Sequence, residues 1–150
     1  MALRDVLPPI WRRFLVPGAI TLHGLHRVIQ EVMGWENYHL HLFRFGKKEY
    51  GIPDPDYPTE MRNERGRRLR EFLRDEGEVF GYEYDFGDSW EHDLVVERIV
   101  IGAEVPDATY LEGERVCTFR CRMTNFENVL QGLGSGDRFG FSAIPGTARK

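Results

Sequence analysis

Three histidines and two aspartates of this chain are of the residue types that build hydrolytic metal sites. His39 and His41 lie two residues apart in "YHLHLF", and His92 follows Asp85 and Asp88 in "YDFGDSWEHD". Imidazole and carboxylate ligands of this kind hold Zn²⁺ or Mn²⁺ in hydrolases. The chain has no HExxH motif and no Cys2His2 spacing, so the residue types alone carry this hypothesis. The alternative is that these histidines are hydrogen-bonded side chains of a partly buried sheet.

The stretch 84–93 also predicts the acidic face of a β-hairpin. Gly87 and Asp88 form a turn signal between two alternating runs of residues. Successive side chains of a strand point to opposite faces, so the aromatic residues and His92 share one face and the acidic residues the other. We therefore expect a polar surface that could bind a partner through Asp85, Asp88, Glu91 and Asp93.

A second candidate binding surface is the arginine-rich segment 62–70, "RNERGRRLR". Arginine is a frequent phosphate ligand in nucleic-acid complexes. Acidic residues interleave with these arginines, however, and mixed charge also decorates an ordinary solvated helix. The net charge of −4 argues against a protein held on nucleic acid by its overall field. It leaves open a local contact through Arg62, Arg65, Arg67, Arg68 and Arg70.

Hydrophobic periodicity predicts the elements that must position these residues. The strongest helix pattern covers 20–35, with Thr21 as a suitable N-cap and Gly34 as a suitable end. Because strand and helix patterns do not alternate regularly, the predicted fold class is α+β, a single domain with a mainly antiparallel sheet and helices packed on one face. The remaining predicted elements are a strand within 8–17, a hairpin over 38–52, helices over 65–77 and 124–133, and strands on both sides of 87–89.

Composition narrows the class of protein further. A chain of 150 residues with 41% hydrophobic residues suits one domain with its own core. No apolar run has the length of a membrane helix, and no signal-peptide pattern is present, so we expect a cytoplasmic protein without membrane contact. Cys117 and Cys121 lack a second cysteine pair and are interpreted as free thiols. No cofactor is expected.

Several segments together resemble a known family: "PPIWRRFLVPGAITLHGLHRVIQEVMGW", "YGIPDP" and "YEYDFGDSWEHDLVVE". They are similar to the ORF-three-like family first named from an Ri plasmid, which is also labelled as the TnpR-like passenger of an insertion element. The resemblance covers residues 3–117 and implies a small α+β domain linked to plasmids and mobile elements, with no catalytic residues to carry over. Residues 118–150 depart from the family pattern. We interpret them as a C-terminal extension with one short helix (124–133) and a loose tail.

The favoured function is a non-enzymatic interaction module, associated with mobile elements, that binds a protein or nucleic-acid partner. The alternative is a metal-dependent hydrolase or nuclease that uses His39, His41, His92 and Asp85 or Asp88. The TnpR label suggests resolvase chemistry, which needs an activated serine in an arginine-rich site. Ser89 lies in an acidic turn, which disfavours a phosphate backbone, so this chemistry is not adopted.

Overall fold

Strands dominate the structure of this chain. The computed structural model describes residues 1–56, 60–100 and 108–114, and the backbone of 138–142. The strands are β1 (Ala2–Leu3), β2 (Trp11–Pro17), β3 (His41–Phe45), β4 (Lys48–Gly51), β5 (Arg62–Asn63), β6 (Val79–Tyr84), β7 (Trp90–Val100), β8 (Thr109–Glu114) and β9 (Arg138–Ser142). The helical elements are α1 (Leu22–Met33) and a 3₁₀ turn, η1 (Leu69–Glu71).

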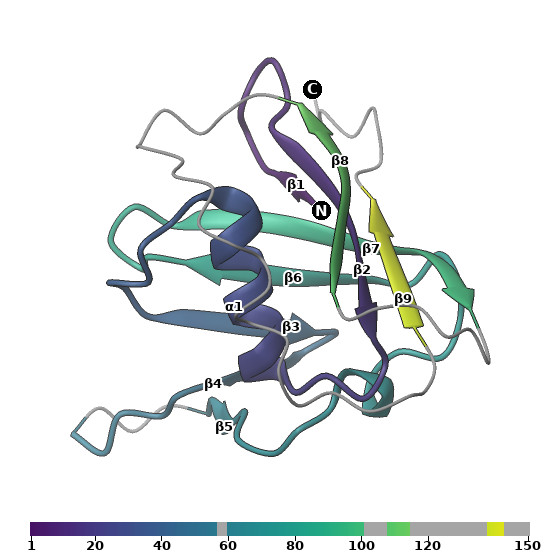
Figure 1. The fold of residues 1–150 in the computed structure, drawn as a ribbon. Helices are drawn as coiled ribbons and strands as arrows, with labels where there is room; N and C mark the ends of the chain where they lie inside the picture. The colour runs from purple at the N-terminus through teal and green to yellow at the C-terminus, as the bar shows by residue number, and fades with distance from the viewer. Residues whose placement is uncertain (57–59, 101–107, 115–137, 143–150) are drawn as a thin grey trace.

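All nine strands belong to one sheet (Figure 1). Its main path runs β1-β2-β9-β7-β6-β3-β4-β5, and β8 pairs with the other side of β2. Strands β1 and β9 each pair with both β2 and β7. They therefore lie one after the other in the space between β2 and β7. Every pairing is antiparallel except β4 with β5, which is parallel.

Helix α1 begins and ends where the sequence predicts. The Thr21 Oγ1 accepts a hydrogen bond from the Gly24 N–H at 3.0 Å, and Gly34 takes the left-handed conformation with φ 74°. The sheet also supplies a hydrogen bond to the C-terminal end of the helix. The Arg12 Nε of β2 donates to the Val32 carbonyl at 2.7 Å. Arg12 is therefore a buried structural residue rather than a surface cation.

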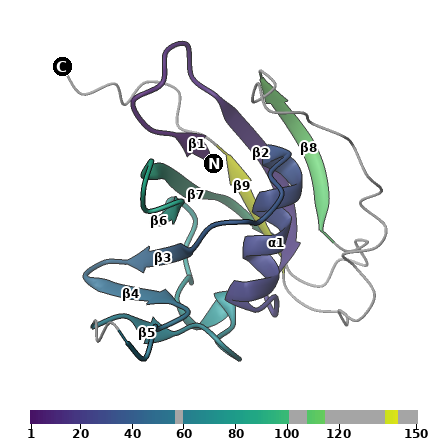
Figure 2. The same cartoon turned by 90° about the vertical axis from the view of Figure 1, so that its left-hand side faces the viewer.

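The core lies between α1 and the concave side of the curved sheet. Figures 1 and 2 together show α1 lying against the sheet, with β2 and β8 along one flank and β3 to β5 along another. Leu25 and Ile29 of the helix are fully buried in one cluster with Phe43, Tyr82 and Leu94 of three strands. This burial of apolar side chains is the main force that holds the helix to the sheet.

The predicted α+β class with helices packed on one face is wrong, because the described chain is mostly sheet with α1 as its one α-helix. Segment 65–77 forms only η1. Besides the short-range bonds of that turn, its backbone pairs with residues 18–22: Leu22 N–H donates to Arg67 O, Leu69 N–H to Ile20 O and Arg70 N–H to Gly18 O. The predicted helix 124–133 and both cysteines lie outside the described residues.

The predicted strands and hairpins are confirmed. Strand β2 alternates as expected, and β3 and β4 are joined at Gly46 and Lys47. Strands β6 and β7 pair from Val79 with Val95 to Tyr84 with Trp90. Phe86 and Trp90, which we expected on the apolar face, remain 42% and 37% exposed at the hairpin tip. In the part of the chain that the structure describes, no helix is long and apolar enough to cross a membrane.

Candidate functional site

The structure brings two of the three predicted metal-binding histidines together and leaves the third elsewhere. His39 and His41 line one pocket, and His39 Nδ1 lies 3.4 Å from Asp85 Oδ2. His92 is fully buried on β7, where the rings of Trp35 and Tyr82 contact it at centroid distances of 5.3 and 5.7 Å. Among the described residues, no group of three or more His, Cys, Asp or Glu is arranged to hold a metal ion. The predicted metal set is therefore not assembled.

The pocket that holds His39 and His41 gathers four of the five histidines of the chain. It has a volume of about 210 Å³ and lies between the start of α1, the loop before β3 and the end of β4. We call it the histidine pocket. It is lined by His23, His26, Asn37, His39, Leu40, His41 and Ile52.

A buried carboxylate lies behind the histidine pocket. Glu64 follows β5 and is 1% exposed, and its Oε2 accepts a 3.0 Å hydrogen bond from His41 Nε2. His23 Nδ1 is 3.4 Å from the other oxygen, Oε1, which has no well-formed hydrogen bond to a described residue. Burial alone would raise the pKa of Glu64, but the hydrogen bond from His41 and the neighbouring imidazoles lower it below its ordinary value. Glu64 is therefore a buried anion.

His26 forms the inner wall of the pocket and is held neutral. Its ring stacks on His41 with centroids 3.5 Å apart. Burial, together with the nearby His41, lowers the pKa of His26 to about 4. Asn37 Oδ1 accepts from Nε2 at 2.6 Å, which leaves Nδ1 to accept from the Tyr82 hydroxyl at 2.8 Å.

This tautomer is fixed by a closed ring of hydrogen bonds. Gln30 Nε2 donates to the Tyr82 hydroxyl at 3.0 Å, and the Asn37 N–H donates to Gln30 Oε1 at 3.1 Å. Each of the four residues donates one hydrogen bond and accepts one within the ring, which makes this wall of the pocket rigid. Four residues of the site were not predicted from the sequence, because none belongs to a recognisable motif: Glu64, Gln30, Asn37 and Tyr82.

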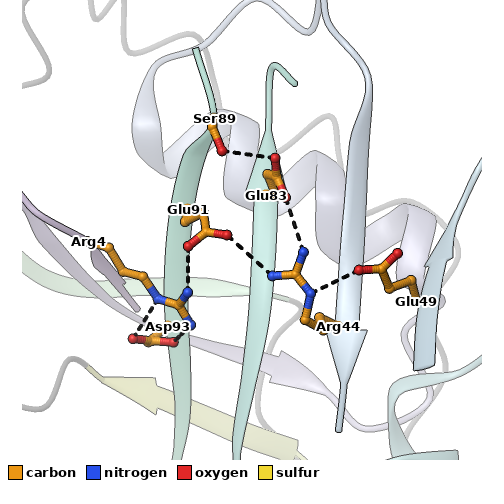
Figure 3. A network of polar contacts seen from close by, with 7 residues as sticks. All are labelled: Arg4, Arg44, Glu49, Glu83, Ser89, Glu91 and Asp93. Carbon is orange, nitrogen blue, oxygen red and sulfur yellow. Dashed lines mark hydrogen bonds and ion pairs between the residues drawn. The ribbon is translucent and has the colours of Figure 1, made fainter. Parts of the chain in front are cut away.

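The predicted acidic surface of the hairpin is partly neutralised within the chain (Figure 3). Glu83 and Glu91 face each other across β6 and β7, and Arg44 of β3 reaches both at 3.3 and 3.4 Å. Arg4 binds Glu91 at 2.6 Å and also binds Asp93. Two of the four predicted binding carboxylates, Glu91 and Asp93, are thus partners of arginines.

The other two carboxylates lie at the hairpin tip. Asp85 has φ 58°, and its Oδ1 accepts a hydrogen bond from the Gly87 N–H at 3.0 Å, so it shapes the turn as well as facing His39. Asp88 is exposed. A partner-binding role for these four carboxylates stays a prediction.

The arginine-rich segment begins at the edge of the sheet with β5, which pairs with β4. Arg67 pairs with Glu71 at 3.0 Å and its guanidinium lies over the rings of Tyr50 and Phe72, which gives it a structural role. The other four cations of the segment are exposed, and none forms an ion pair with a described carboxylate. They are Arg62, Arg65, Arg68 and Arg70.

Replacing His92 by Leu is expected to leave the free energy of unfolding unchanged or to raise it by up to about 1 kcal/mol. The backbone of Tyr82 and Trp90 faces the ring, but neither ring nitrogen makes a well-formed hydrogen bond to a described residue. Removing a buried polar group without partners removes its desolvation cost. Urea unfolding measures the change, and a loss above about 2 kcal/mol would show that the nitrogens are well bonded.

The described chain forms a curved sheet packed around α1, and a solved structure has a similar fold. The chain resembles the crystal structure of a protein of unknown function, MM3350, from Methanosarcina mazei Go1, with a TM-score of 0.66 and 31% sequence identity. The similarity covers 77% of this chain and 66% of that one.

The chain belongs to the family described as plasmid pRiA4b ORF-3-like protein, whose model matches residues 1–129. The resemblance to the plasmid ORF-three-like family is therefore confirmed. The uncharacterized protein y4hQ of Sinorhizobium fredii is 39% identical over 109 residues, which cover 71% of this chain and 56% of that protein. The chain spans little more than half the length of this curated relative.

Proposed function

We propose that this protein is a nucleic-acid-binding module that contacts the phosphate backbone through its arginine-rich segment. One contrast carries the proposal. Arg4, Arg13 and Arg44 are held in ion pairs with carboxylates of the sheet. The four exposed arginines of segment 62–70 have no such partner among the described residues. Exposed guanidinium groups at this density are what a phosphate backbone binds.

The position of the segment supports the same partner. It begins with β5, the edge strand of the sheet, and no other described strand covers that edge. The net charge of −4 does not oppose this contact, because screening limits the reach of distant charges to about 10 Å at 0.1 M salt. The plasmid in the family description agrees with a nucleic-acid partner but does not carry the proposal.

Changing Arg65, Arg68 and Arg70 together to Gln is expected to weaken binding of labelled single-stranded RNA and DNA at least tenfold at low salt. It should also reduce the slope of log K against log salt by roughly 2 to 3, because each lost phosphate contact removes about 0.7 to 0.9. Fluorescence anisotropy across a salt series measures both quantities.

A matched control removes the same charge from other faces. Arg27, Lys47 and Arg98 are exposed on α1, the β3–β4 turn and β7, and their change to Gln also removes three positive charges. Binding should stay within about twofold of the unmodified protein in this control. Equal losses in both triple variants would show a nonspecific charge effect, and absence of binding at low salt would rule out the proposal.

A further inference from the structure

We propose that the histidine pocket cleaves RNA by general acid–base catalysis, with His23 and His39 as the catalytic residues. The inference rests on the proposed function, because the arginine-rich segment must bring the strand to the pocket. It goes beyond binding, since it assigns a reaction to side chains that segment 62–70 does not include.

Two imidazoles that line the pocket, those of His23 and His39, each have a carboxylate near Nδ1. His23 Nδ1 lies 3.4 Å from Glu64 Oε1, and His39 Nδ1 lies 3.4 Å from Asp85 Oδ2. Their side chains are 55% and 52% exposed, so both are open to a ligand. A carboxylate this close to Nδ1 stabilises an imidazolium electrostatically, while Nε2 stays available for proton transfer. Neither Nε2 has a hydrogen bond to a described residue.

The pocket wall supplies no nucleophile. The described residues that line it carry no hydroxyl or thiol group. Ser89, the serine of the hairpin, donates to Glu83 in the polar network of Figure 3. A substrate that carries its own nucleophile suits such a site. RNA does, since its ribose 2′-hydroxyl lies next to the phosphodiester, whereas DNA lacks this group.

The reaction needs only two proton transfers. The neutral imidazole accepts the 2′-hydroxyl proton on Nε2 as the 2′-oxygen forms a bond to the adjacent phosphorus. The bond from phosphorus to the 5′-oxygen breaks, and the imidazolium of the second histidine gives its proton to that oxygen. The products are a 2′,3′-cyclic phosphate and a 5′-hydroxyl end, and no other reactant is consumed.

The surroundings of the pocket fit a nucleotide. Arg62 lies two residues before Glu64 and Arg65 one residue after it, and the Glu64 N–H donates to the Gly51 carbonyl at 2.9 Å, next to Ile52 of the pocket wall. The backbone that carries these two cations therefore passes beside the pocket, and cations there would stabilise phosphate charge. Leu40 and Ile52 are 55% and 45% exposed at the pocket, where an unstacked base finds apolar contact.

The test is cleavage of a 5′-labelled single-stranded RNA by the purified full chain in EDTA. The expected products carry a 2′,3′-cyclic phosphate, and an RNA with one 2′-deoxy position should resist cleavage there. His23→Gln and His39→Gln should each lower the rate at least about 100-fold, the lower range for acid–base groups. Arg27→Gln, an exposed change on the same helix as His23, should keep the full rate.

The pH profile gives a second readout. The rate should pass through a maximum, because one histidine must be neutral while the other is protonated. The groups that face His23 are Glu64 and the His26 ring, and those that face His39 are Asp85 and the Tyr84 ring. Each single variant should lose one limb of this profile.

The outcomes separate this inference from the proposed function. Salt-sensitive binding of an all-DNA strand without cleavage of RNA would overturn the catalytic inference and leave the binding proposal intact. Cleavage that persists in both histidine variants would come from another nuclease and would also overturn it. Absence of binding to either strand would overturn both.

Discussion

Replacing His41 by Leu is expected to lower the free energy of unfolding by roughly 3 to 5 kcal/mol, because it leaves the buried Glu64 carboxylate without its hydrogen-bond partner. Glu64 is 1% exposed, and its hydrogen bond from His41 is what lowers its pKa despite burial. Leu offers no donor, so the carboxylate must either stay charged without that hydrogen bond or take up a proton. Both outcomes cost free energy in the folded state only.

Urea unfolding of four proteins tests this prediction: the unmodified chain, His41→Leu, Glu64→Met and the double variant. The double variant should recover much of the loss, because two apolar side chains of similar volume replace the pair without leaving a buried charge. His39→Leu is the matched control, since its side chain is 52% exposed and its change should cost less than about 1 kcal/mol. A loss below about 1 kcal/mol for His41→Leu would contradict the prediction.

Local patterns in the sequence were sufficient for α1, β2 and the two hairpins. Thr21 and Gly34 mark the helix ends by chemistry that acts within one turn. Segment 65–77 shows the limit of this reasoning. Its apolar residues have helical spacing, but the backbone of residues 67–70 bonds to residues 18–22, a long-range pairing that periodicity does not encode.

The same limit explains why the candidate site was only partly predicted. Strand alternation correctly places His92 on the aromatic face, but it says nothing of the distance to His41. Strands β3 and β7 lie on opposite sides of β6, so about 10 Å separates them and Tyr82 and Tyr84 stand between. In the sequence, Glu64 is one of several acidic residues in a charged segment. It is buried beside His41 only because β5 pairs with β4.

The second large effect that we expect is a loss of stability in mild acid. Burial is the main cause that lowers the pKa of both His26 and His92 from 6.5 to about 4. The unfolded chain therefore binds more protons than the folded chain between these two values. Stability is full above pH 6.5 and falls as the pH decreases toward 4. By pH 5, each histidine should contribute a loss of about 2 kcal/mol relative to pH 7.

Urea unfolding between pH 7.5 and 4.5 measures this loss, which should total about 4 kcal/mol at pH 5 if the two sites are independent. His92→Leu should halve it, because the variant keeps only the contribution of His26. Glu64, whose pKa lies below its ordinary value, changes stability in the same direction but only at lower pH, where its carboxylate takes up a proton. A free energy of unfolding that is constant from pH 7 to pH 5 would show that neither buried imidazole is held neutral by the fold.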